Sequence, residues 1–176
     1  MKLLNRSQKG FTLMELLIAL PIIAIVVAAA SGALIQVIQS TSTSAHMVAL
    51  RQVQTAGYWV SKDGIQAKSV TTGAEANSGF PLNLSWTDYD NNTHDVEYSL
   101  QDIYLQRKEI VNSEVGNPII TMVGQYIDPD YTSCKPFGHV LAPDEVLTFT
   151  VTAKVAGARG PQTETRTYEI KPRPGS

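Results

Sequence analysis

The stretch KGFTLMELLIAL, residues 9–20, places a single glutamate inside an otherwise apolar run. Between Phe11 and Ile38, Glu15 is the only ionisable side chain. That run is longer than the about 20 residues that an α-helix needs to cross a bilayer. A charged side chain at the middle of such a helix costs roughly 2.5–3.5 kcal/mol on insertion scales, so Glu15 needs a functional explanation.

The ten residues before the run form a basic flank. MKLLNRSQKG carries Lys2, Arg6 and Lys9 and no acidic residue. Basic flanks stay on the cytoplasmic side, so we expect the rest of the chain to face outward. Without these three charges the formal net charge falls from -2 to -5. Such an acidic remainder lacks the basic footprint of a nucleic-acid-binding domain.

A cleavable secretory signal is an alternative interpretation of the apolar run. The alanines at 28–30 resemble the small-residue site at which such a signal is cut. The run, however, continues beyond these alanines to Ile38 and is longer than a typical signal core. Its length favours retention as a membrane anchor.

Residues 10–18, GFTLMELLI, resemble the class III signal of type IV prepilins and type II secretion pseudopilins. The resemblance implies that a prepilin peptidase cuts between Gly10 and Phe11 and that the new Phe11 amine is N-methylated. The family's glutamate is the fifth residue after the cut, where Glu15 stands. The resemblance also implies a single-pass protein of the bacterial inner membrane that passes into a pilus or pseudopilus. Its implied partners are other pilin subunits, the inner-membrane assembly platform and membrane lipid.

This resemblance suggests a role for Glu15 in assembly. Its carboxylate would neutralise the Phe11 amine of a neighbouring subunit, and attraction between unit charges grows steeply as the effective dielectric falls. Such a pair sets the axial register of stacked helices, and breaking a buried pair costs about 3–5 kcal/mol. The alternative is a Glu15 side chain that snorkels to the membrane interface.

Two residues are predicted to weaken the helix. Pro21 removes a backbone hydrogen bond and should kink the helix near Ile18. Gly32 stands where the family's most familiar proline falls, and glycine also has a low helix propensity. In assembled filaments of this family the helix often loosens around such a site.

A polar stretch, residues 39–44, marks the exit from the membrane, and helical periodicity then resumes to about Gln66. The predicted buried stripe recurs at steps of three and four residues: Ala45, Val48, Ala49, Gln52, Val53, Ala56 and Val60. Arg51, Gln54 and Lys62 lie off this stripe.

Beyond the helix the apolar period changes from 3.6 to 2, which is typical of strands. The expected strands are 82–86, 96–100, 103–110, 147–155 and 163–171, and the expected loops or turns are 71–79, 87–93 and 156–161. The final strand should place Tyr168 and Ile170 on its inner face. We therefore predict an α+β, pilin-like fold, with the second half of a long helix packed on an antiparallel β-sheet.

This pattern divides the chain into four segments. They are a cleaved leader (1–10), the transmembrane half of the helix (11–38), its amphipathic half (39–66) and an antiparallel β domain (67–176). Trp59, Trp86 and Tyr58 are predicted to be core residues rather than ligand platforms.

The domain shows no catalytic or cofactor motif, so we expect no enzyme, no cofactor and no metal. Asp88, Asp90 and Asn92 resemble the start of a calcium loop, but His94 occupies the glycine position and Ser99 the position of the final glutamate. We predict a solvated hairpin turn there, with weak calcium binding as the alternative. The three histidines lack zinc spacing, and the chain has no phosphate-binding loop.

The second half also resembles a subgroup of the family. YWVSKDGIQA, VEYSLQDIYLQRKE and the long C-terminal hairpin are similar to J-type minor pseudopilins and W-type minor pilins. Major pilins usually close a C-terminal loop with a cysteine pair, whereas Cys134 is alone here. We expect Cys134 to be a loop or packing thiol, with an intermolecular bridge as the alternative.

Two functional classes follow. The first is a structural, minor subunit of a type IV pilus or type II secretion pseudopilus. The second is a membrane-anchored surface binding protein, an adhesin or a DNA receptor, that uses the pilin export route.

Overall fold

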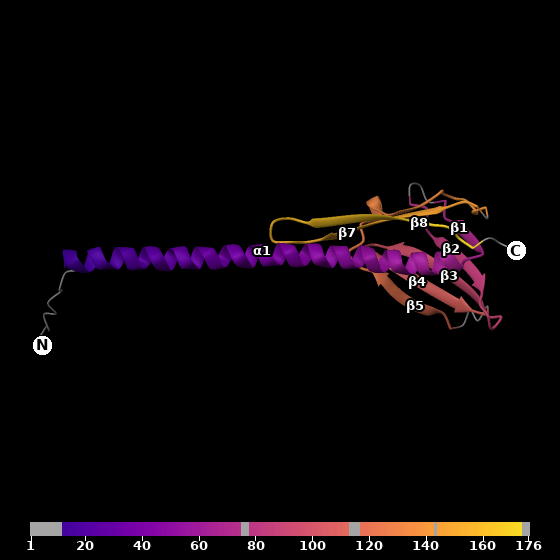
Figure 1. Cartoon of the computed structure of the whole chain (residues 1–176), viewed down its shortest axis with the longest axis horizontal. Coiled ribbons are helices and arrows are strands. Elements are labelled where there is room, and N and C mark those ends of the chain that lie inside the picture. The colour runs from indigo at the N-terminus through magenta and orange to yellow at the C-terminus, as the bar shows by residue number, and fades with distance from the viewer. Residues whose placement is uncertain (1–11, 75–77, 113–116, 143, 174–176) are drawn as a thin grey trace, which may run out of the picture. The chain divides into compact units, whose positions relative to one another are not determined.

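The computed structural model describes residues 12–74, 78–112, 117–142 and 144–173. The described chain forms one helix, α1 (Leu13–Gln66), followed by strands and a short 3-10 turn (Figure 1). The later elements are β1 (Ser69–Thr72), β2 (Leu82–Thr87), β3 (Thr93–Gln101), β4 (Tyr104–Val111), β5 (Ile119–Gly124), η1 (Pro129–Tyr131), β6 (Ser133–Lys135), β7 (Leu147–Val155) and β8 (Gln162–Ile170). The chain divides into two compact units, and the division falls inside α1, between Thr41 and Ser42.

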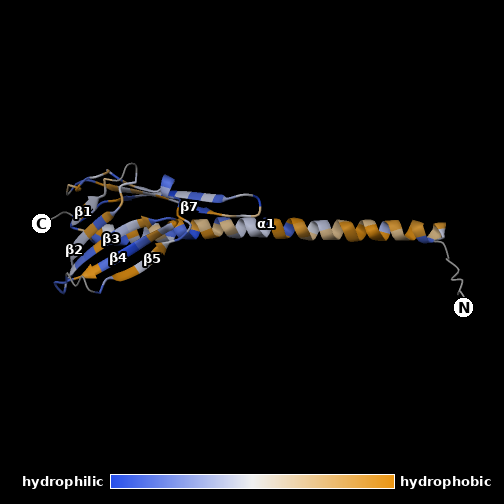
Figure 2. Cartoon of the chain, turned by 180° about the vertical axis from the view of Figure 1, so that it is seen from behind, coloured by the Kyte–Doolittle hydropathy of each residue, from blue (hydrophilic) through white to orange (hydrophobic). Residues whose placement is uncertain are grey.

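The first unit contains the apolar part of α1. Figure 2 shows that this part is mostly hydrophobic, and its large apolar side chains are exposed. By length and composition α1 contains a segment able to cross a membrane. The Ser31 and Thr41 hydroxyls donate to the carbonyls of Val27 and Val37 at 2.8 and 2.9 Å. These bonds satisfy both hydroxyl donors within the helix itself.

The α-helix is continuous through Pro21 and Gly32 in this single chain. A Cβ added at Gly32 would meet no atom within 4 Å, so neither packing nor a close approach requires glycine there. Weakening of the helix at these two positions therefore stays a prediction about the assembled state.

In the second unit, two antiparallel sheets lie on opposite sides of the C-terminal part of α1 (Figure 1). One sheet is a five-stranded meander in the order β1-β2-β3-β4-β5, and the other has three strands in the order β6-β7-β8. The predicted α+β, pilin-like fold is confirmed, with two sheets where the sequence analysis expected one. The division into two sheets lets one helix bury apolar surface on two faces.

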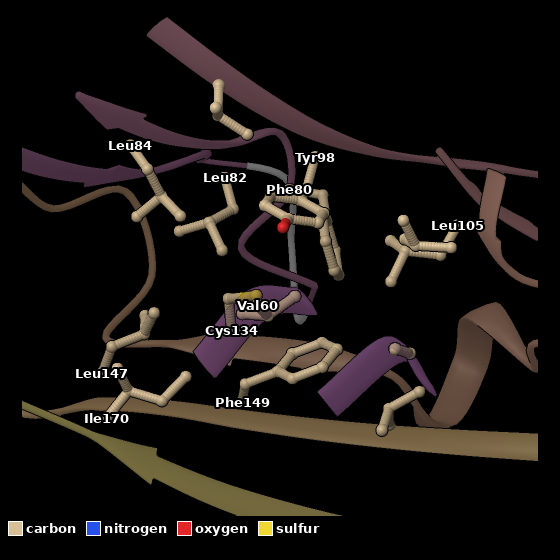
Figure 3. Packing of buried hydrophobic residues seen from close by; sticks show 14 of the residues in the cluster. Val60, Phe80, Leu82, Leu84, Tyr98, Leu105, Cys134, Leu147, Phe149 and Ile170 are labelled. Carbon is tan, nitrogen blue, oxygen red and sulfur yellow. The ribbon is translucent and has the colours of Figure 1, made fainter. Parts of the chain in front are cut away.

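The core joins both sheets to the helix (Figure 3). Five buried helix residues come from the predicted stripe, namely Ala45, Ala49, Val53, Ala56 and Val60. All of them except Ala45 belong to one core cluster with Leu82 and Tyr98 of the large sheet and Phe149 of the small one. Two stripe positions differ from the prediction: Val48 is exposed, and Gln52 is half-buried with its Oε1 accepting from the Gln125 N–H at 2.8 Å.

Close approach of β8 to α1 depends on two glycines. A Cβ on Gly57 would overlap the Tyr168 ring, and one on Gly64 would lie 2.8 Å from Ile170 Cγ2. The Tyr168 hydroxyl also donates to the Val53 carbonyl at 3.1 Å. The predicted inward orientation of Tyr168 and Ile170 is therefore confirmed, and small helix residues make room for them.

Several strand predictions are confirmed, and others are wrong in detail. The predicted strands correspond to β2, β3, β4, β7 and β8, with ends that move by up to three residues. The predicted loop 71–79 is wrong at its start, because Thr71 and Thr72 belong to β1. Strands β5 and β6 were not predicted: β5 is an apolar run without alternation, and β6 has three residues.

The side chains singled out as core residues differ in their environment. Trp86 is buried, and Trp59 is partly buried and packs against the core, as predicted. Tyr58 was predicted to be core, but 61% of it is exposed, since it lies on the outward face of α1 beside Trp59. Cys134 is fully buried in β6, which confirms a packing thiol, and burial raises the pKa of that thiol. A buried thiol cannot reach a partner chain.

We expect the fragment from Thr41 to Ser176 to fold alone as a soluble monomer without added metal. Nearly all of this fragment is the second compact unit, which contains the whole buried core. Circular dichroism in calcium-free buffer should give a mixed helix and strand spectrum with a cooperative thermal transition. A spectrum typical of a disordered chain would show that the domain boundary is wrong or that the domain needs a metal to fold.

Candidate functional site

The first candidate site is the N-terminal turn of α1. Thr12 directly precedes the helix, and Glu15 lies in its first turn with an exposed side chain. The Thr12 N–H and hydroxyl both donate to Glu15 Oε2 at 3.3 Å, and Thr12 Oγ1 accepts from the Glu15 N–H at 3.3 Å. This is the reciprocal arrangement of a capping box, whose T-x-x-E signature the sequence analysis overlooked.

The capping box defines what Glu15 can do in an isolated chain. Its carboxylate lies near the positive end of the helix dipole, which stabilises a negative charge. A carboxylate has about four acceptor sites, and Thr12 uses only part of that capacity, so an exposed Glu15 can also accept from a cation. Gly10 and Phe11, the predicted cleavage and methylation residues, lie outside the described residues.

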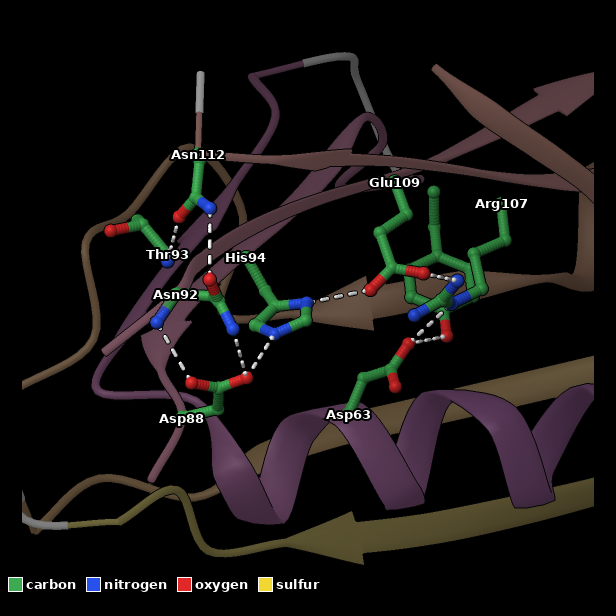
Figure 4. A network of polar contacts seen from close by, with 9 residues as sticks. Asp63, Asp88, Asn92, Thr93, His94, Arg107, Glu109 and Asn112 are labelled. Carbon is green, nitrogen blue, oxygen red and sulfur yellow. Dashed lines mark hydrogen bonds and ion pairs between the residues drawn. The ribbon is translucent and has the colours of Figure 1, made fainter. Parts of the chain in front are cut away.

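The second candidate site is a buried ion pair in the domain, which the sequence analysis did not predict (Figure 4). Asp63 of α1 and Arg107 of β4 are 1% and 4% exposed. Arg107 Nε donates to Asp63 Oδ2 at 2.6 Å, and the Tyr98 hydroxyl donates to the same oxygen at 2.5 Å. Burial, reinforced by the Asp63 carboxylate, raises the pKa of Tyr98, so its hydroxyl remains a donor.

The ion pair continues outward into a longer polar network. Arg107 Nη1 donates to Glu109 Oε2 at 2.8 Å. His94 Nδ1 lies 2.8 Å from Glu109 Oε1, and its Nε2 lies 3.1 Å from Asp88 Oδ2. The His94 ring also stacks on Trp86 with 5.1 Å between ring centroids. The network therefore ties α1 to β3, β4 and the β2–β3 turn.

The Asp88 side chain organises that turn. Its Oδ1 accepts from the Asn92 N–H at 2.8 Å, while its Oδ2 accepts from Asn92 Nδ2 at 3.1 Å and faces His94. The predicted hairpin turn between β2 and β3 is confirmed, and both Asp88 oxygens have donors from the chain itself. Among the described residues, no group of three or more His, Cys, Asp or Glu side chains is arranged to hold a metal ion.

A cleft of about 460 Å³ opens beside the network, and Asp63, Asp88, Glu109 and Arg107 all line it. These charged groups are already paired with one another or with His94. A set of internally satisfied charges offers little to a ligand, because each new contact would first have to break an existing one. We therefore interpret this network as a structural connection within the domain.

The charges of the network also shift its pKa values. Burial alone lowers the pKa of His94, but hydrogen bonds with Asp88 and Glu109 outweigh it, so the net pKa lies above 6.5. The hydrogen bond with His94, followed by those from Asn92, lowers the pKa of Asp88 from 3.8 to about 2. Burial alone raises the pKa of Glu109, but hydrogen bonds from Arg107 and His94 lower it overall.

These shifts predict the pH dependence of stability. Because folding raises the pKa of His94, its contribution is fully present below pH 6.5 and is lost as the pH rises through the folded pKa. The Asp88 contribution is present above pH 3.8 and is lost as the pH falls towards about 2. We expect the thermal midpoint of the full chain in detergent micelles to fall from pH 6 to pH 9, and to fall less in His94→Gln.

The matched control is His46→Gln, which replaces an exposed histidine of α1. It should keep the alkaline decline of the unmodified chain. Equal declines in the His94→Gln variant and the unmodified chain would contradict a charged His94 between two carboxylates.

Comparison with known families decides how the N-terminal turn is interpreted. Residues 5–31 match the family model described as the prokaryotic N-terminal methylation motif. The matched segment contains Gly10, Phe11 and Glu15 and extends into the apolar part of α1. This methylation motif supports the resemblance to type IV pilins and pseudopilins, and with the apolar helix it fits membrane anchoring.

The match ends before the β domain, so it carries no information on the subgroup of pilin. No curated protein and no solved structure matches the chain. The motif points to a structural protein.

Proposed function

We propose that this chain is a minor structural subunit of a type IV pilus or type II secretion pseudopilus. The single observation that carries the proposal is Glu15 in the first turn of a long, exposed, apolar helix, inside a match to the methylation motif. A soluble protein has no use for so large an exposed apolar surface, because burial of such surface is the main stabilising term in water.

The proposed sequence of events begins in the bacterial inner membrane. Prepilin peptidase cuts after Gly10, and the Phe11 amine is methylated. The part of α1 that belongs to the first unit lies in lipid, and the domain lies outside the cytoplasm. The assembly platform then transfers the subunit to a filament. In the filament, helices of other subunits replace lipid around α1, and the Glu15 carboxylate neutralises the Phe11 amine of a neighbour.

The minor type is supported by the domain. Cys134 is the single cysteine and is buried, so this chain lacks the cysteine pair that usually closes the C-terminal loop of major pilins. The sequence stretches YWVSKDGIQA and VEYSLQDIYLQRKE, with the long C-terminal hairpin, resemble J-type pseudopilins and W-type minor pilins.

Isolation of the filaments tests this proposal. Sheared pili, or pseudopili from cells that overproduce the secretion system, are purified and their subunits are quantified by mass spectrometry. We expect the purified filaments to contain this chain in an amount much smaller than that of the main subunit. Its presence in membranes with complete absence from filaments would instead favour a membrane-anchored adhesin or DNA receptor.

A further inference from the structure

Strand β5 is an open edge of the five-stranded sheet, where it pairs with β4 on one side. Among the described residues, no backbone hydrogen bond joins residues 119–124 to another segment on the other side. An edge strand presents a row of free N–H and C=O groups, which is a template for pairing with another chain. β5 therefore offers hydrogen-bonding groups at the spacing of a β-ladder.

The other sheet edges in the described part of the chain are covered or charged. At β1, the Leu141 N–H donates to the Val70 carbonyl at 2.9 Å. At β6, the Cys134 N–H donates to the Ser78 carbonyl at 2.7 Å. The free edge of β8 carries two glutamates and an arginine, and charged side chains on an edge discourage pairing with another strand.

β5 lacks both kinds of protection. The sequence from residue 115 to residue 127 contains no charged side chain. Ile119, Ile120 and Met122 are 54%, 58% and 50% exposed. Ile119 lines the cleft beside α1, and strand alternation places Ile120 and Met122 on the opposite face. Exposed apolar side chains therefore flank the free backbone on both faces of the sheet.

The hydrogen-bond pattern of the sheet shows which way the backbone of Ile120 points. The Asn112 N–H, directly after β4, donates to the Thr93 carbonyl of β3 at 2.8 Å. Antiparallel ladders alternate, so the even-numbered residues of β4 face β3 and the odd-numbered ones face β5. Arg107 is opposite Thr121, and the Ile120 N–H and C=O therefore point away from β4, towards the free edge.

The chemistry of this edge selects a strand as its occupant. Consecutive N–H and C=O groups along a strand are satisfied by another extended backbone, whereas a lipid tail or the apolar side chains of a helix would leave them unpaired. The apolar side chains on both faces select an uncharged strand, because burial of an unpaired charge beside them is costly. The methylation motif indicates other pilin-like subunits as protein partners.

We propose that the β5 edge binds an uncharged, extended strand of another pilin-like subunit, which lengthens the five-stranded sheet by one strand. Main-chain hydrogen bonds supply affinity, and the alternating apolar contacts supply specificity. The choice of a pilin-like partner rests on the proposed function, because a minor subunit meets other kinds of subunit more often than copies of itself. The strand pairing rests on the edge alone.

Photocrosslinking in intact cells that make all the subunits of the system tests the pairing. A diazirine amino acid replaces Ile120 in one variant and Met122 in another, and mass spectrometry locates the adducts. We expect both variants to mark one segment of the same partner subunit, at sites two residues apart, because paired strands keep a fixed register. A diazirine amino acid in place of Thr163, exposed on β8, is the matched control and should not mark that segment.

The substitution Ile120→Pro tests the role of the backbone. Proline lacks an N–H and is tolerated on an edge strand where that N–H points outward, so the thermal midpoint in micelles should change little. We expect the adducts formed from position 122 to fall about tenfold, since one hydrogen bond and the fit around it are lost. Ile120→Lys, which keeps the N–H but adds a charge, should give a similar loss, and Ile120→Val should give none.

Three outcomes would overturn the proposal: adducts with lipid alone, adducts with β5 of a second copy, or adducts without the offset of two residues. Analysis of purified filaments separates this result from the proposed function. If filaments contain the chain but no adducts in register form, the strand pairing is wrong and the filament function stands. If adducts in register form in cells whose filaments lack the chain, the filament function is wrong and the strand pairing stands.

Discussion

Replacing Glu15 by glutamine is expected to leave the chain in the membrane while removing it from filaments. The substitution makes the apolar helix less polar, so insertion should improve slightly. The amide cannot neutralise the Phe11 amine of a neighbouring subunit, which then stays charged in a poor solvent. Since breaking a buried ion pair costs about 3–5 kcal/mol, we expect incorporation to fall by at least a hundredfold.

The capping box makes glutamine the informative substitution. Glutamine can replace glutamate in a capping box, so a Glu15 that only caps the helix predicts normal assembly of Glu15→Gln and a defect in Glu15→Ala. A snorkelling Glu15 predicts nearly normal assembly of both variants. An inter-subunit ion pair predicts that both variants fail.

Membrane fractionation combined with crosslinking to partner pilins separates these cases. Ser31→Ala is the matched control, because the Ser31 hydroxyl bonds only to the Val27 carbonyl of its own helix. It should assemble normally. Normal crosslinking of the Glu15→Gln variant would contradict the proposed ion pair between subunits.

A subunit at the tip of the filament would lose incorporation only in part, because no subunit ahead of it supplies an amine for its Glu15.

Replacing Asp63 by asparagine is expected to lower the free energy of unfolding of the domain by about 3–5 kcal/mol. The change leaves the Arg107 guanidinium, 4% exposed, with Glu109 as its remaining carboxylate. It also weakens the acceptor for the buried Tyr98 hydroxyl. At roughly 2–5 °C per kcal/mol for a domain of this size, the thermal midpoint should fall by about 10 °C or more.

Thermal unfolding of the full chain in micelles, followed by circular dichroism, measures this loss. The matched control is Glu164→Gln, which removes a half-buried carboxylate of β8 that lies 3.6 Å from Nε of the exposed Arg166. Surface ion pairs contribute about 0–1 kcal/mol, so the control should unfold almost like the unmodified chain. Similar midpoints for Asp63→Asn and the control would contradict the structural role of the network.

The fold was predictable where the sequence pattern is long and regular. The apolar run and the stripe that follows it predicted α1 to its last residue, Gln66. Regular alternation predicted β7, whose bounds match the predicted strand at 147–155. Strands β1 and β6 were missed because four and three residues are too few to show a period. Their place in the sheets depends on partners distant in the sequence.

The two candidate sites differ in how far the sequence reveals them. Glu15 was predictable because every residue that defines its motif lies within a few positions of it. The ion pair of Asp63 and Arg107 joins residues 44 positions apart, so local spacing gives no signal for it. One sign was available: Asp63 follows Val60 by three residues and therefore falls on the buried stripe of α1. A carboxylate on a buried stripe needs a buried partner.

The central claim is that this chain is processed and assembled as a pilin-like subunit. The most direct test is the intact mass of the mature chain, extracted from membranes of cells that contain prepilin peptidase. The account predicts a chain that begins at Phe11 and carries one methyl group on its amine. A chain that retains Met1, or one that is cut after Ala30, would contradict it.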